Sequence, residues 1–218
     1  MARLPPQSDG LLSAIVLAAG LSRRMGPRNK LLLPVDGVPL VRRSVTVVLG
    51  HPFVEVVVVT GHEAPLIEAA LGGLTVRVVH NPRYEEGQMT SVRAGLEALS
   101  ARGARDVGDA SARGVMVCLA DQPALTTEDL GTVADAFLAR VACPVLVPTF
   151  GGARGNPIVL GWPSLESILS RGANFGCRQF VAKNADVVTT FEMPNDHVLT
   201  DVDRPEDYAA LGASSARV

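Results

Sequence analysis

The chain has 218 residues, of which 47% are hydrophobic and 19% charged, a composition that excludes a wholly disordered protein. Its 20 basic and 22 acidic residues give a formal net charge of −2, so it lacks the basic excess of a nucleic-acid-binding protein. No apolar stretch is long enough to span a membrane, and the first ten residues lack an apolar signal core. We therefore expect a cytoplasmic protein with neither a membrane nor a nucleic-acid partner, and its three widely spaced cysteines fit a reducing compartment.

Short apolar runs alternate with helical segments along the chain. Runs rich in Val, Ile and Leu predict buried strands at residues 12–18, 54–60, 74–79, 115–120 and 145–148. The segments between them predict helices at residues 39–49, 63–71, 90–99 and 127–140. This alternation is typical of βαβ units, so we expect an α/β fold with a mostly parallel sheet.

The remaining segments are less regular. Residues 101–114 are rich in Arg, Gly and Asp and predict a surface loop. Beyond residue 150 the sequence predicts a glycine-rich turn at 151–155 and helices near 164–170, 175–183 and from Pro205. The length suits a single domain over residues 1–218, with loose ends at 1–10 and 213–218.

Polar residues follow four of the predicted strands, at residues 19–24, 60–62, 80–82 and 121–123. In open parallel sheets, ligands bind at the carboxyl ends of the strands. We therefore expect four separate pieces of chain to build one site at that edge of the sheet.

The first of these pieces is a glycine-rich loop at residues 17–26. Gly20 and Gly26 can adopt backbone angles closed to most residues, and free N–H groups in such a loop can hold phosphate oxygens. Arg23, Arg24 and Lys30 add the positive charge that a phosphate group requires. The loop matches neither the dinucleotide fingerprint G-x-G-x-x-G nor the P-loop pattern G-x-x-x-x-G-K-[ST]. A solvated strand-to-helix turn is the alternative interpretation.

Acidic residues form the second candidate feature. Asp121 ends an apolar strand, where a carboxylate can reach into a cleft, and carboxylates are ligands that Mg²⁺ prefers. Asp201 and Asp203 are two residues apart, so in an extended segment both face the same side. The alternative for Asp121 is a turn or helix-cap residue, and Asp203 also suits the start of the helix at Pro205.

Six sequence blocks together carry a family resemblance. They are L-A-A-G-L-S-R-R-M-G (17–26), followed by Lys30 and L-L-L-P-V, then N-P (81–82), G-Q-M-T-S-V-R-A-G (87–95), L-A-D-Q-P (119–123), R-G-N-P (154–157) and D-V-D-R-P-E-D (201–207). In this order they resemble the molybdopterin nucleotidyltransferases, a group with the nucleotide-diphospho-sugar transferase fold. The resemblance covers nearly the whole chain and implies a Rossmann-like three-layer αβα sandwich.

The resemblance also implies a reaction. A nucleoside monophosphate would pass from a nucleoside triphosphate to a phosphate on an acceptor, with release of pyrophosphate. Such a site must hold two anions together and neutralise the α-phosphorus centre, which a Mg²⁺ ion and positive side chains can do. The acceptor phosphate arrives ionised, so no side-chain nucleophile or general base is required. His51, His62, His80 and His197 show no metal-ligand spacing, and most are expected to be loop or core histidines.

The motifs imply roles residue by residue. The catalytic residues would be Arg24, Lys30 and Asp121, and the metal ligands Asp121, Asp203 and Asp201. The nucleotide-binding residues would be Leu17, Ala18, Ala19, Gly20, Ser22, Arg23, Gly26, Thr60, Gly61, Asn81, Gln88 and Ser91. The acceptor-binding residues would be Gln122, Arg154, Gly155 and Asn156. The chain departs from the family in having three residues between Gly26 and Lys30, where the family usually has two, and Asn156 where the cytidylyl branch often has histidine.

The order Ala18-Ala19-Gly20 resembles the cytidylyl branch, whereas the guanylyl branch carries a second glycine at this point. The resemblance therefore implies CTP and molybdopterin as small-molecule ligands, molybdopterin cytosine dinucleotide as the product, and a molybdenum hydroxylase or its chaperone as the protein partner. Three alternatives remain open. They are a transferase that uses GTP or another phosphorylated acceptor, a non-catalytic carrier of the molybdenum cofactor, and a Rossmann-type oxidoreductase, although the fingerprint of the last is absent.

Overall fold

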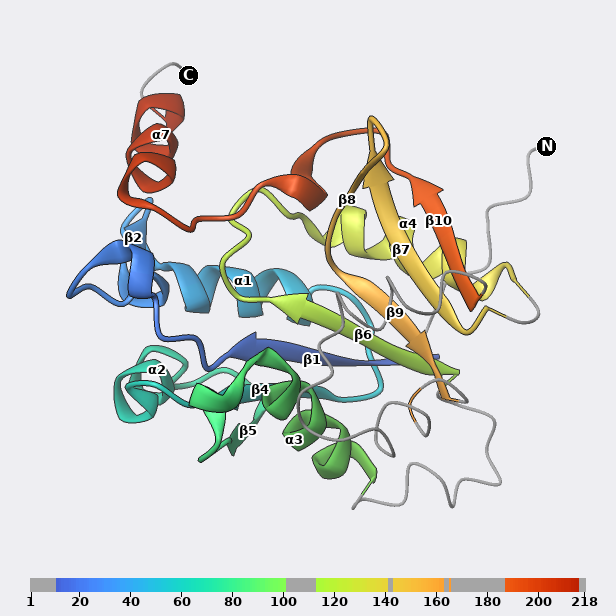
Figure 1. Cartoon of the computed structure of the whole chain (residues 1–218), viewed down its shortest axis with the longest axis horizontal. Coiled ribbons are helices and arrows are strands. Elements are labelled where there is room, and N and C mark those ends of the chain that lie inside the picture. The colour runs from blue at the N-terminus through green and yellow to red at the C-terminus, as the bar shows by residue number, and fades with distance from the viewer. Residues whose placement is uncertain (1–10, 101–112, 141–142, 163–164, 166–186, 216–218) are drawn as a thin grey trace.

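A mixed, mostly parallel β-sheet forms the centre of the computed structural model, which describes residues 11–100, 113–140, 143–162, 165 and 187–215. The strand order across the sheet is β10-β7-β9-β6-β1-β4-β5 (Figure 1). The strands are β1 (Leu12–Ala18), β4 (Val56–Thr60), β5 (Arg77–His80), β6 (Gly114–Leu119), β7 (Val145–Phe150), β9 (Ile158–Gly161) and β10 (Val188–Glu192), and the short β8 (Ala153–Arg154) pairs with β7.

The pairing confirms the predicted βαβ organisation. β1 pairs parallel with β4 on one side and with β6 on the other, β4 pairs parallel with β5, and β10 pairs parallel with β7. β9 runs antiparallel between β6 and β7. β9, and the short β8 that pairs antiparallel with β7, are thus the reversed strands of this sheet among the described residues.

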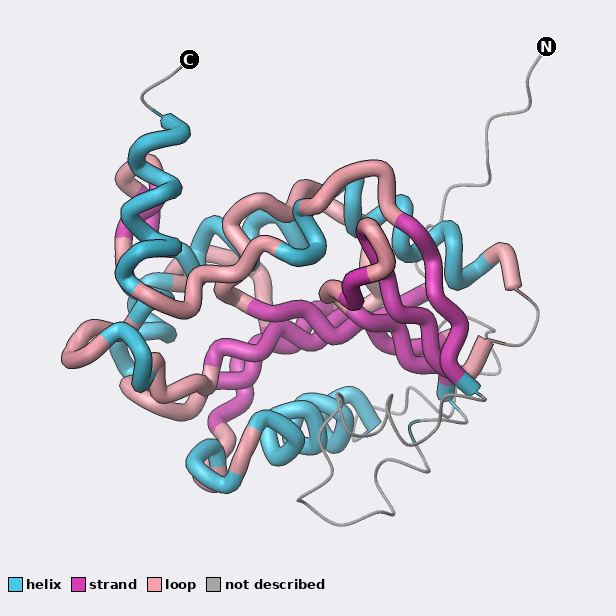
Figure 2. Tube along the Cα trace, turned by 45° about the horizontal axis from the view of Figure 1, so that its top comes forward, coloured by secondary structure: helices cyan, strands magenta, loops and turns pink. Residues whose placement is uncertain are grey.

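Helices cover both faces of the sheet, as Figure 2 shows. The helices are α1 (Leu40–Leu49), α2 (Ala64–Ala70), α3 (Gln88–Ser100), α4 (Thr127–Leu138) and α7 (Pro205–Ser215). The 3₁₀ helices are η1 (Arg23–Met25), η2 (Lys30–Leu32), η3 (Tyr84–Glu86) and η5 (His197–Leu199), and β2 (Pro34–Val35) pairs with β3 (Val38–Pro39) in a small antiparallel ribbon.

Alternate side chains of the central strand explain the three layers. Ala14 and Val16 of β1 pack in a buried cluster with residues of α1, α2 and α4, whereas Ile15 packs on the opposite face with residues of α3. Successive residues of a strand point to opposite faces of the sheet. Because helices cover both faces, each of these β1 side chains is completely buried. The expected three-layer αβα sandwich is thus confirmed.

Several predicted boundaries differ from the structure. β5 begins at Arg77, three residues later than predicted, and α3 begins at Gln88 rather than at residue 90. β9 and β10 were not predicted, because β9 has only four residues and none of the five β10 residues is fully buried. The helix α7 extends to Ser215, and the expected loose tail at residues 213–218 stays a prediction. The predicted helices near 164–170 and 175–183, and residues 101–112 of the predicted loop, lie outside the described residues.

The carboxyl ends of β1, β4, β5 and β6 lie at the same edge of the sheet, because these four strands run parallel. The C-terminal segment crosses to this edge: α7 stands beside β2, where the hydroxyl of Tyr208 donates to the carbonyl of Pro34 at 2.6 Å (Figure 1). Within the part of the chain that the structure describes, no helix combines the length and apolar character needed to cross a bilayer.

Candidate active site

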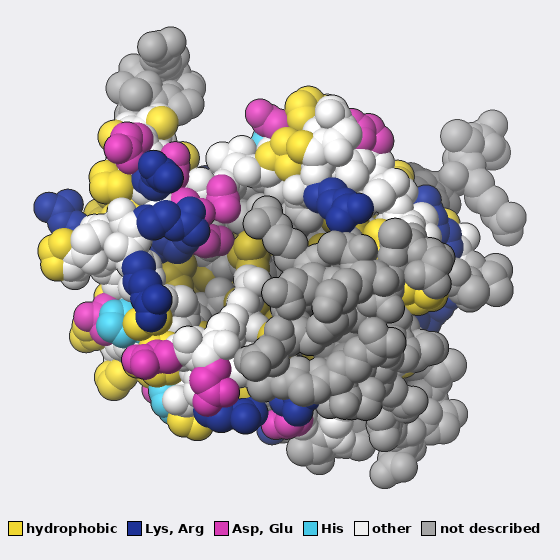
Figure 3. Space-filling model, viewed as in Figure 1, with side chains coloured by type: hydrophobic (Ala, Val, Ile, Leu, Met, Phe, Trp, Pro, Cys, Tyr) yellow, Lys and Arg dark blue, Asp and Glu magenta, His cyan; other side chains and the backbone are white. Residues whose placement is uncertain are grey.

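A cavity of about 540 Å³ opens at the carboxyl ends of β1 and β6. Figure 3 shows the hollow, with Lys, Arg, Asp and Glu side chains gathered along its rim. Its walls come from the loop after β1, from residues 84–91 and from the residues after β6, joined by one aspartate of the C-terminal segment. The predicted site residues that line it are Leu17, Ala19, Gly20, Ser22, Arg23, Arg24, Lys30, Gln88, Ser91, Asp121 and Asp203.

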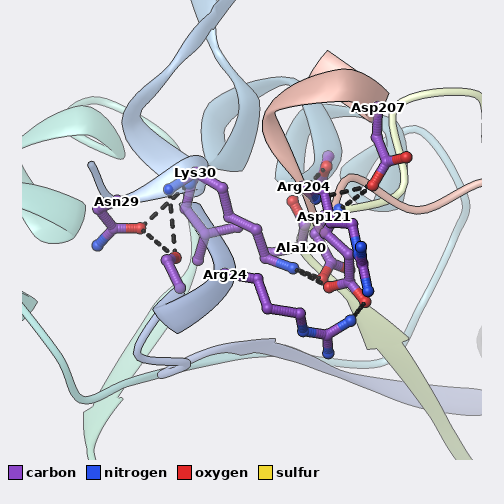
Figure 4. A network of polar contacts seen from close by, with 11 residues as sticks. Arg24, Asn29, Lys30, Ala120, Asp121, Arg204 and Asp207 are labelled. Atoms are coloured by element: carbon purple, nitrogen blue, oxygen red, sulfur yellow. Dashed lines mark hydrogen bonds and ion pairs between the residues drawn. The ribbon is translucent and has the colours of Figure 1, made fainter. Parts of the chain in front are cut away.

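Two cations and two carboxylates alternate at one wall of the cavity. The Lys30 Nζ atom lies 2.5 Å from Asp121 Oδ2 and 2.8 Å from Asp203 Oδ1. The Arg24 Nη1 atom lies 2.5 Å from Asp203 Oδ2. Figure 4 shows Lys30 and Arg24 reaching from the loop after β1 towards Asp121 at the end of β6. Charged side chains that are up to 179 residues apart in the sequence thus form one cluster.

The cluster shifts the pKa values of Lys30 and Asp203. Burial opposes the charge on Lys30, but the carboxylates of Asp121 and Asp203 outweigh it and raise the pKa of the ammonium group above its ordinary value. Burial likewise opposes ionisation of Asp203, and Lys30 and Arg24 outweigh it, so the pKa of this carboxyl is lowered. The cluster therefore favours the charged forms of Lys30 and Asp203.

The C-terminal segment is tied to the end of β6 by its backbone. The Val202 N–H donates to the carbonyl of Asp121 at 2.9 Å, which places Asp203 beside the strand end. Asp207 Oδ2 accepts hydrogen bonds from the N–H groups of Asp203 and Arg204, at 2.9 and 2.7 Å, at the start of α7. The Asp207 side chain thus caps this helix start, and the Asp203 side chain is directed to Arg24 and Lys30 instead.

The loop after β1 is closed by a residue that the sequence analysis did not single out. Asn29 Oδ1 accepts from the Ser22 hydroxyl at 3.3 Å and from the Leu31 N–H at 3.1 Å. The Ser22 Oγ atom in turn accepts from the Lys30 N–H at 3.2 Å, and Ser22 has a φ of 50°, in the left-handed region. The longer spacing between Gly26 and Lys30 thus accommodates Asn29, whose side chain holds the loop so that Lys30 reaches both carboxylates.

Two carboxylates at the cavity wall offer oxygen ligands to a divalent cation. Asp121 Oδ1 is buried and has no hydrogen-bond partner among the described residues, so one carboxylate oxygen is available to a cation. Asp203 supplies a second carboxylate beside it, and oxygen ligands of this kind suit Mg²⁺. In the described residues no group of three or more His, Cys, Asp or Glu side chains is arranged to hold a metal. The two carboxylates fit a cation that takes its other ligands from phosphate oxygens and water.

Asp201 stands apart from this pair. It does not line the cavity, and burial together with the charges of Asp203 and Asp121 raises its pKa above the ordinary value. A role for Asp201 as a metal ligand stays a prediction.

Other predicted nucleotide-binding residues support the cavity wall from behind. Thr60 is fully buried, and its hydroxyl lies 3.2 Å from Glu68 Oε1. Asn81 is also buried, and its Nδ2 donates to the hydroxyls of Thr90 and Ser91 at 2.8 and 2.9 Å. Asn81 therefore orients Ser91, which does line the cavity.

The small residues of the site play different parts. A Cβ atom on Gly61 would lie 2.8 Å from the Ala19 methyl and 2.6 Å from the Tyr84 Cβ, so only glycine permits this close approach. The Ala18 side chain points to the other face of the sheet, into the cluster with α1. Ala18, Gly26 and Gly61 are absent from the cavity lining.

Three of the four predicted acceptor-binding residues contact the backbone carbonyl of Val198 rather than the cavity. Gln122 Nε2 and the Asn156 N–H both donate to the carbonyl of Val198, each at 3.0 Å. Gly155 packs directly against Val198, and Arg154 is exposed on β8. None of the four lines the cavity.

Tyr84 and Glu85 line the cavity, although neither was predicted from the sequence. They form part of η3, immediately before the G-Q-M-T-S block, and no motif marked them. Their position between the end of β5 and the start of α3, next to a predicted strand end, is the signal that could have identified them.

Comparison with known proteins identifies the family. The sequence profile of the MobA-like NTP transferase domain matches residues 14–187. The chain belongs to this family. The match spans most of the sheet and both carboxyl-end loops that carry Lys30 and Asp121.

Two relatives that carry different names have the same sequence identity to the chain. Molybdenum cofactor cytidylyltransferase of Escherichia coli strain K12 is 26% identical over 198 residues, which cover 90% of this chain and 93% of the relative. Nicotine blue oxidoreductase of Paenarthrobacter nicotinovorans is also 26% identical, over 92% of this chain and 96% of the relative.

Solved structures agree with the fold. A nucleotidyl transferase from Methanothermobacter thermautotroptrophicus has a TM-score of 0.72 and 26% identity, covering 95% of this chain and 98% of that one. A protein of Mycobacterium tuberculosis H37Rv, determined in complex with manganese, has a TM-score of 0.71 and 22% identity, covering 94% of this chain and 99% of that one. A divalent metal is thus bound by a protein of the same fold.

Proposed function

We propose that this protein is a Mg²⁺-dependent cytidylyltransferase. It transfers CMP from CTP to the phosphate of molybdopterin in the molybdenum cofactor and releases pyrophosphate, giving molybdopterin cytosine dinucleotide. The observation that carries the proposal is the cluster at the cavity wall, where Lys30 lies between Asp121 and Asp203 and Arg24 pairs with Asp203. This arrangement, in a member of the MobA-like NTP transferase family, suits a polyphosphate and a divalent cation.

The reaction needs charge neutralisation more than proton transfer. An oxygen of the acceptor phosphate forms a bond to the α-phosphorus of CTP, and the bond from this phosphorus to the bridging oxygen of the β-phosphate breaks. The electron pair of the broken bond leaves with pyrophosphate. Both reactants are anions, so the site must lower their mutual repulsion while holding them in line.

The side chains around the cavity divide this work. Arg24, Lys30 and the N–H groups of the loop after β1 bind the β- and γ-phosphates and stabilise the pyrophosphate that leaves. Asp121 and Asp203 would hold the Mg²⁺ ion, which supplies positive charge to the phosphate oxygens. Lys30 is protonated in the free protein, so its charge is already present when the triphosphate arrives.

The part of the cavity that Ala19 lines suits a pyrimidine base better than a larger purine. The Ala19 methyl lies against Gly61 and lines the cavity, so it takes up room that a glycine would leave to a larger base. One methyl group is worth about 1 kcal/mol, so hydrogen bonds to the base must supply the rest of the selectivity. Gln88 and Ser91 line the cavity and carry the polar groups suited to this task.

The experiment that tests the proposal is incubation of the protein with Mg²⁺, molybdopterin and each of the four nucleoside triphosphates in turn, with pyrophosphate release as the readout. We expect the highest kcat/KM with CTP. Asp121→Asn should abolish release, whereas Asp135→Asn, which alters an exposed residue of α4, should leave it unchanged.

Each alternative predicts a different result. Better turnover with GTP would identify a guanylyltransferase, and molybdopterin binding without any transfer would identify a carrier that delivers the cofactor to a molybdenum hydroxylase or its chaperone. Reductase activity with a nicotinamide dinucleotide and no pyrophosphate release would identify an enzyme similar in activity to the nicotine blue oxidoreductase.

A further inference from the structure

A buried carboxylate outside the cavity accepts an unusual number of hydrogen bonds. Asp129, at the start of α4, is 4% exposed. Its Oδ2 accepts from the Thr126 N–H at 2.9 Å, from the Thr126 hydroxyl at 2.7 Å and from His197 Nδ1 at 2.8 Å. Its Oδ1 accepts from Asn195 Nδ2 at 2.9 Å. Because an ionised carboxylate can only accept, His197 carries its proton on Nδ1.

Helix capping accounts for only part of this arrangement. Thr126 and Asp129 form the reciprocal capping box of α4, which needs no residue from elsewhere in the chain. The bonds from Asn195 and His197 come from a segment more than 65 residues away. They join the start of α4 to the residues that lead into η5.

The next residue along the chain connects this network to the predicted acceptor site. Val198 is 1% exposed, and its carbonyl accepts hydrogen bonds from Gln122 Nε2 and from the Asn156 N–H. A Cβ atom on Gly155 would lie 2.6 Å from the same carbonyl oxygen, so the turn at Gly155 has no room to move towards η5. The position of Val198 therefore sets the positions of three predicted acceptor-binding residues.

Gln122 depends on this contact more than the others do. Its Oε1 atom is buried and has no hydrogen-bond partner in the described residues, so the bond from Nε2 to Val198 decides the orientation of the amide. Four residues further on, the Val202 N–H binds the carbonyl of Asp121, so the same segment also leads to Asp203. Because the Val202 and Asp207 contacts anchor Asp203 separately, a displacement of His197 would disturb the acceptor side and leave the carboxylate pair largely in place.

We propose that Asp129, Asn195 and His197 form a latch that positions the acceptor-binding residues. The three are positioning residues, because none lines the cavity and each acts through Val198 on Gln122, Gly155 and Asn156. In this inference, the identity of the acceptor rests on the proposed function. The placement of the latch between α4 and η5 does not depend on that function.

Kinetic constants of His197 variants test the latch. His197→Ala should raise the KM for molybdopterin about tenfold, the effect expected from loss of a hydrogen bond to a charged group, with the KM for CTP changed less than about twofold. His197→Asn places an amide nitrogen where Nδ1 lies and should restore most of the affinity. His197→Gln carries its amide one bond further from the backbone and should not. Equal changes in both KM values, or no rescue by asparagine, would overturn the proposal.

A matched control separates positioning from stability. Thr126→Ala removes the hydroxyl of the capping box but keeps the bond from His197 to Asp129. It should lower the melting temperature of the protein and leave the KM for molybdopterin unchanged. An equal rise of this KM in Thr126→Ala would mean that the network only stabilises the fold.

Amide hydrogen exchange gives a readout that needs no substrate. His197→Ala should speed exchange at the Asn156 amide, which donates to Val198, and Thr126→Ala should not. Unchanged exchange in His197→Ala would refute the latch even if cytidylyl transfer is confirmed. Faster exchange in a protein that transfers no nucleotide would support the latch and refute the proposed function instead.

Discussion

The Lys30 Nζ atom lies 2.5 Å from Asp121 Oδ2, although 91 residues separate the two in the sequence. The same nitrogen also contacts Asp203, so the lysine keeps two carboxylates close together that would otherwise repel each other. In the free protein the ammonium group therefore supplies the positive charge that the two carboxylates require. Phosphate groups that bind Lys30 in place of the carboxylates would leave both carboxylates free to bind a cation.

Removing the ammonium group should destabilise the free protein. Lys30→Met leaves Asp121 and Asp203 facing each other, and these side chains are only 17% and 27% exposed. We expect a loss of about 2 kcal/mol, between the values typical of exposed and buried ion pairs, and a melting temperature lower by roughly 6 °C. Thermal unfolding measures both.

The same variant tests whether the carboxylates bind a cation. Mn²⁺ without nucleotide should raise the melting temperature of Lys30→Met more than that of the wild-type protein, because the competing ammonium is gone. Arg43→Met, which breaks the exposed pair with Asp36, should respond to Mn²⁺ as the wild type does. An equal or smaller response in Lys30→Met than in the wild type would show that the Lys30 ammonium and Mn²⁺ do not compete for the two carboxylates.

The Ala19 methyl should contribute to the choice of base. Ala19→Gly removes about 1 kcal/mol of contact and opens room beside Gly61, so the ratio of kcat/KM for CTP to that for GTP should fall about fivefold. Ala18→Gly is the matched control, because the neighbouring methyl points to the opposite face of the sheet. Ala18→Gly should lower the free energy of unfolding and leave the ratio of kcat/KM values unchanged. An equal fall of this ratio in both variants would show that Ala19 has no special role in base selection.

Asn29 should matter for nucleotide affinity. Its Oδ1 atom holds Ser22 and the Leu31 N–H, and through them the loop that carries Lys30. Asn29→Ala removes two hydrogen bonds, so we expect CTP to bind about tenfold more weakly in calorimetric titrations. The KM for the acceptor should stay the same. Unchanged CTP affinity would show that the loop keeps its shape without this side chain.

The latch carboxylate should make stability depend on pH in the acid range. Burial alone would raise the pKa of Asp129, but hydrogen bonds from Asn195, His197 and Thr126 outweigh burial and lower it. A lowered pKa in the folded state means that the stabilisation is complete above the unfolded pKa of about 3.9 and is lost as the pH falls through the folded value.

Urea unfolding between pH 7 and pH 3 checks this expectation. The free energy of unfolding of the wild-type protein should fall more steeply below pH 4 than that of Asn195→Ala, in which one of the stabilising bonds is missing. Asp135→Asn should follow the wild-type curve. If the free energy of unfolding of Asn195→Ala fell more steeply in acid than that of the wild type, the bond from Asn195 would not lower the pKa of Asp129.

Much of the fold follows from local sequence patterns. The residues of β1 alternate between two helix layers, and the apolar run that forms this strand was predicted with its observed ends. β9 could not be predicted in the same way, because its position between β6 and β7 depends on pairing with strands distant in the sequence. A short run of apolar residues gives no information about the direction in which it joins a sheet.

In the site, too, local sequence patterns predicted some residues, whereas others depend on contacts between distant segments. Motifs located Arg24, Lys30, Asp121 and Asp203, because strand ends and phosphate-binding loops have recognisable patterns. They did not distinguish residues that contact the cavity from residues that support it, such as Asn81 behind Ser91. They also gave His197 no role, since its partner Asp129 lies 68 residues away and the contact exists only in the folded chain.

Transfer of labelled phosphate tests the central claim most directly. With Mg²⁺ and molybdopterin, CTP labelled on the α-phosphate should pass its label to molybdopterin, whereas CTP labelled on the γ-phosphate should pass it to pyrophosphate. Asp121→Asn should lose both transfers while keeping its fold. Label from the γ-position on the acceptor, or no label on the acceptor from any nucleotide, would contradict cytidylyl transfer at this cavity.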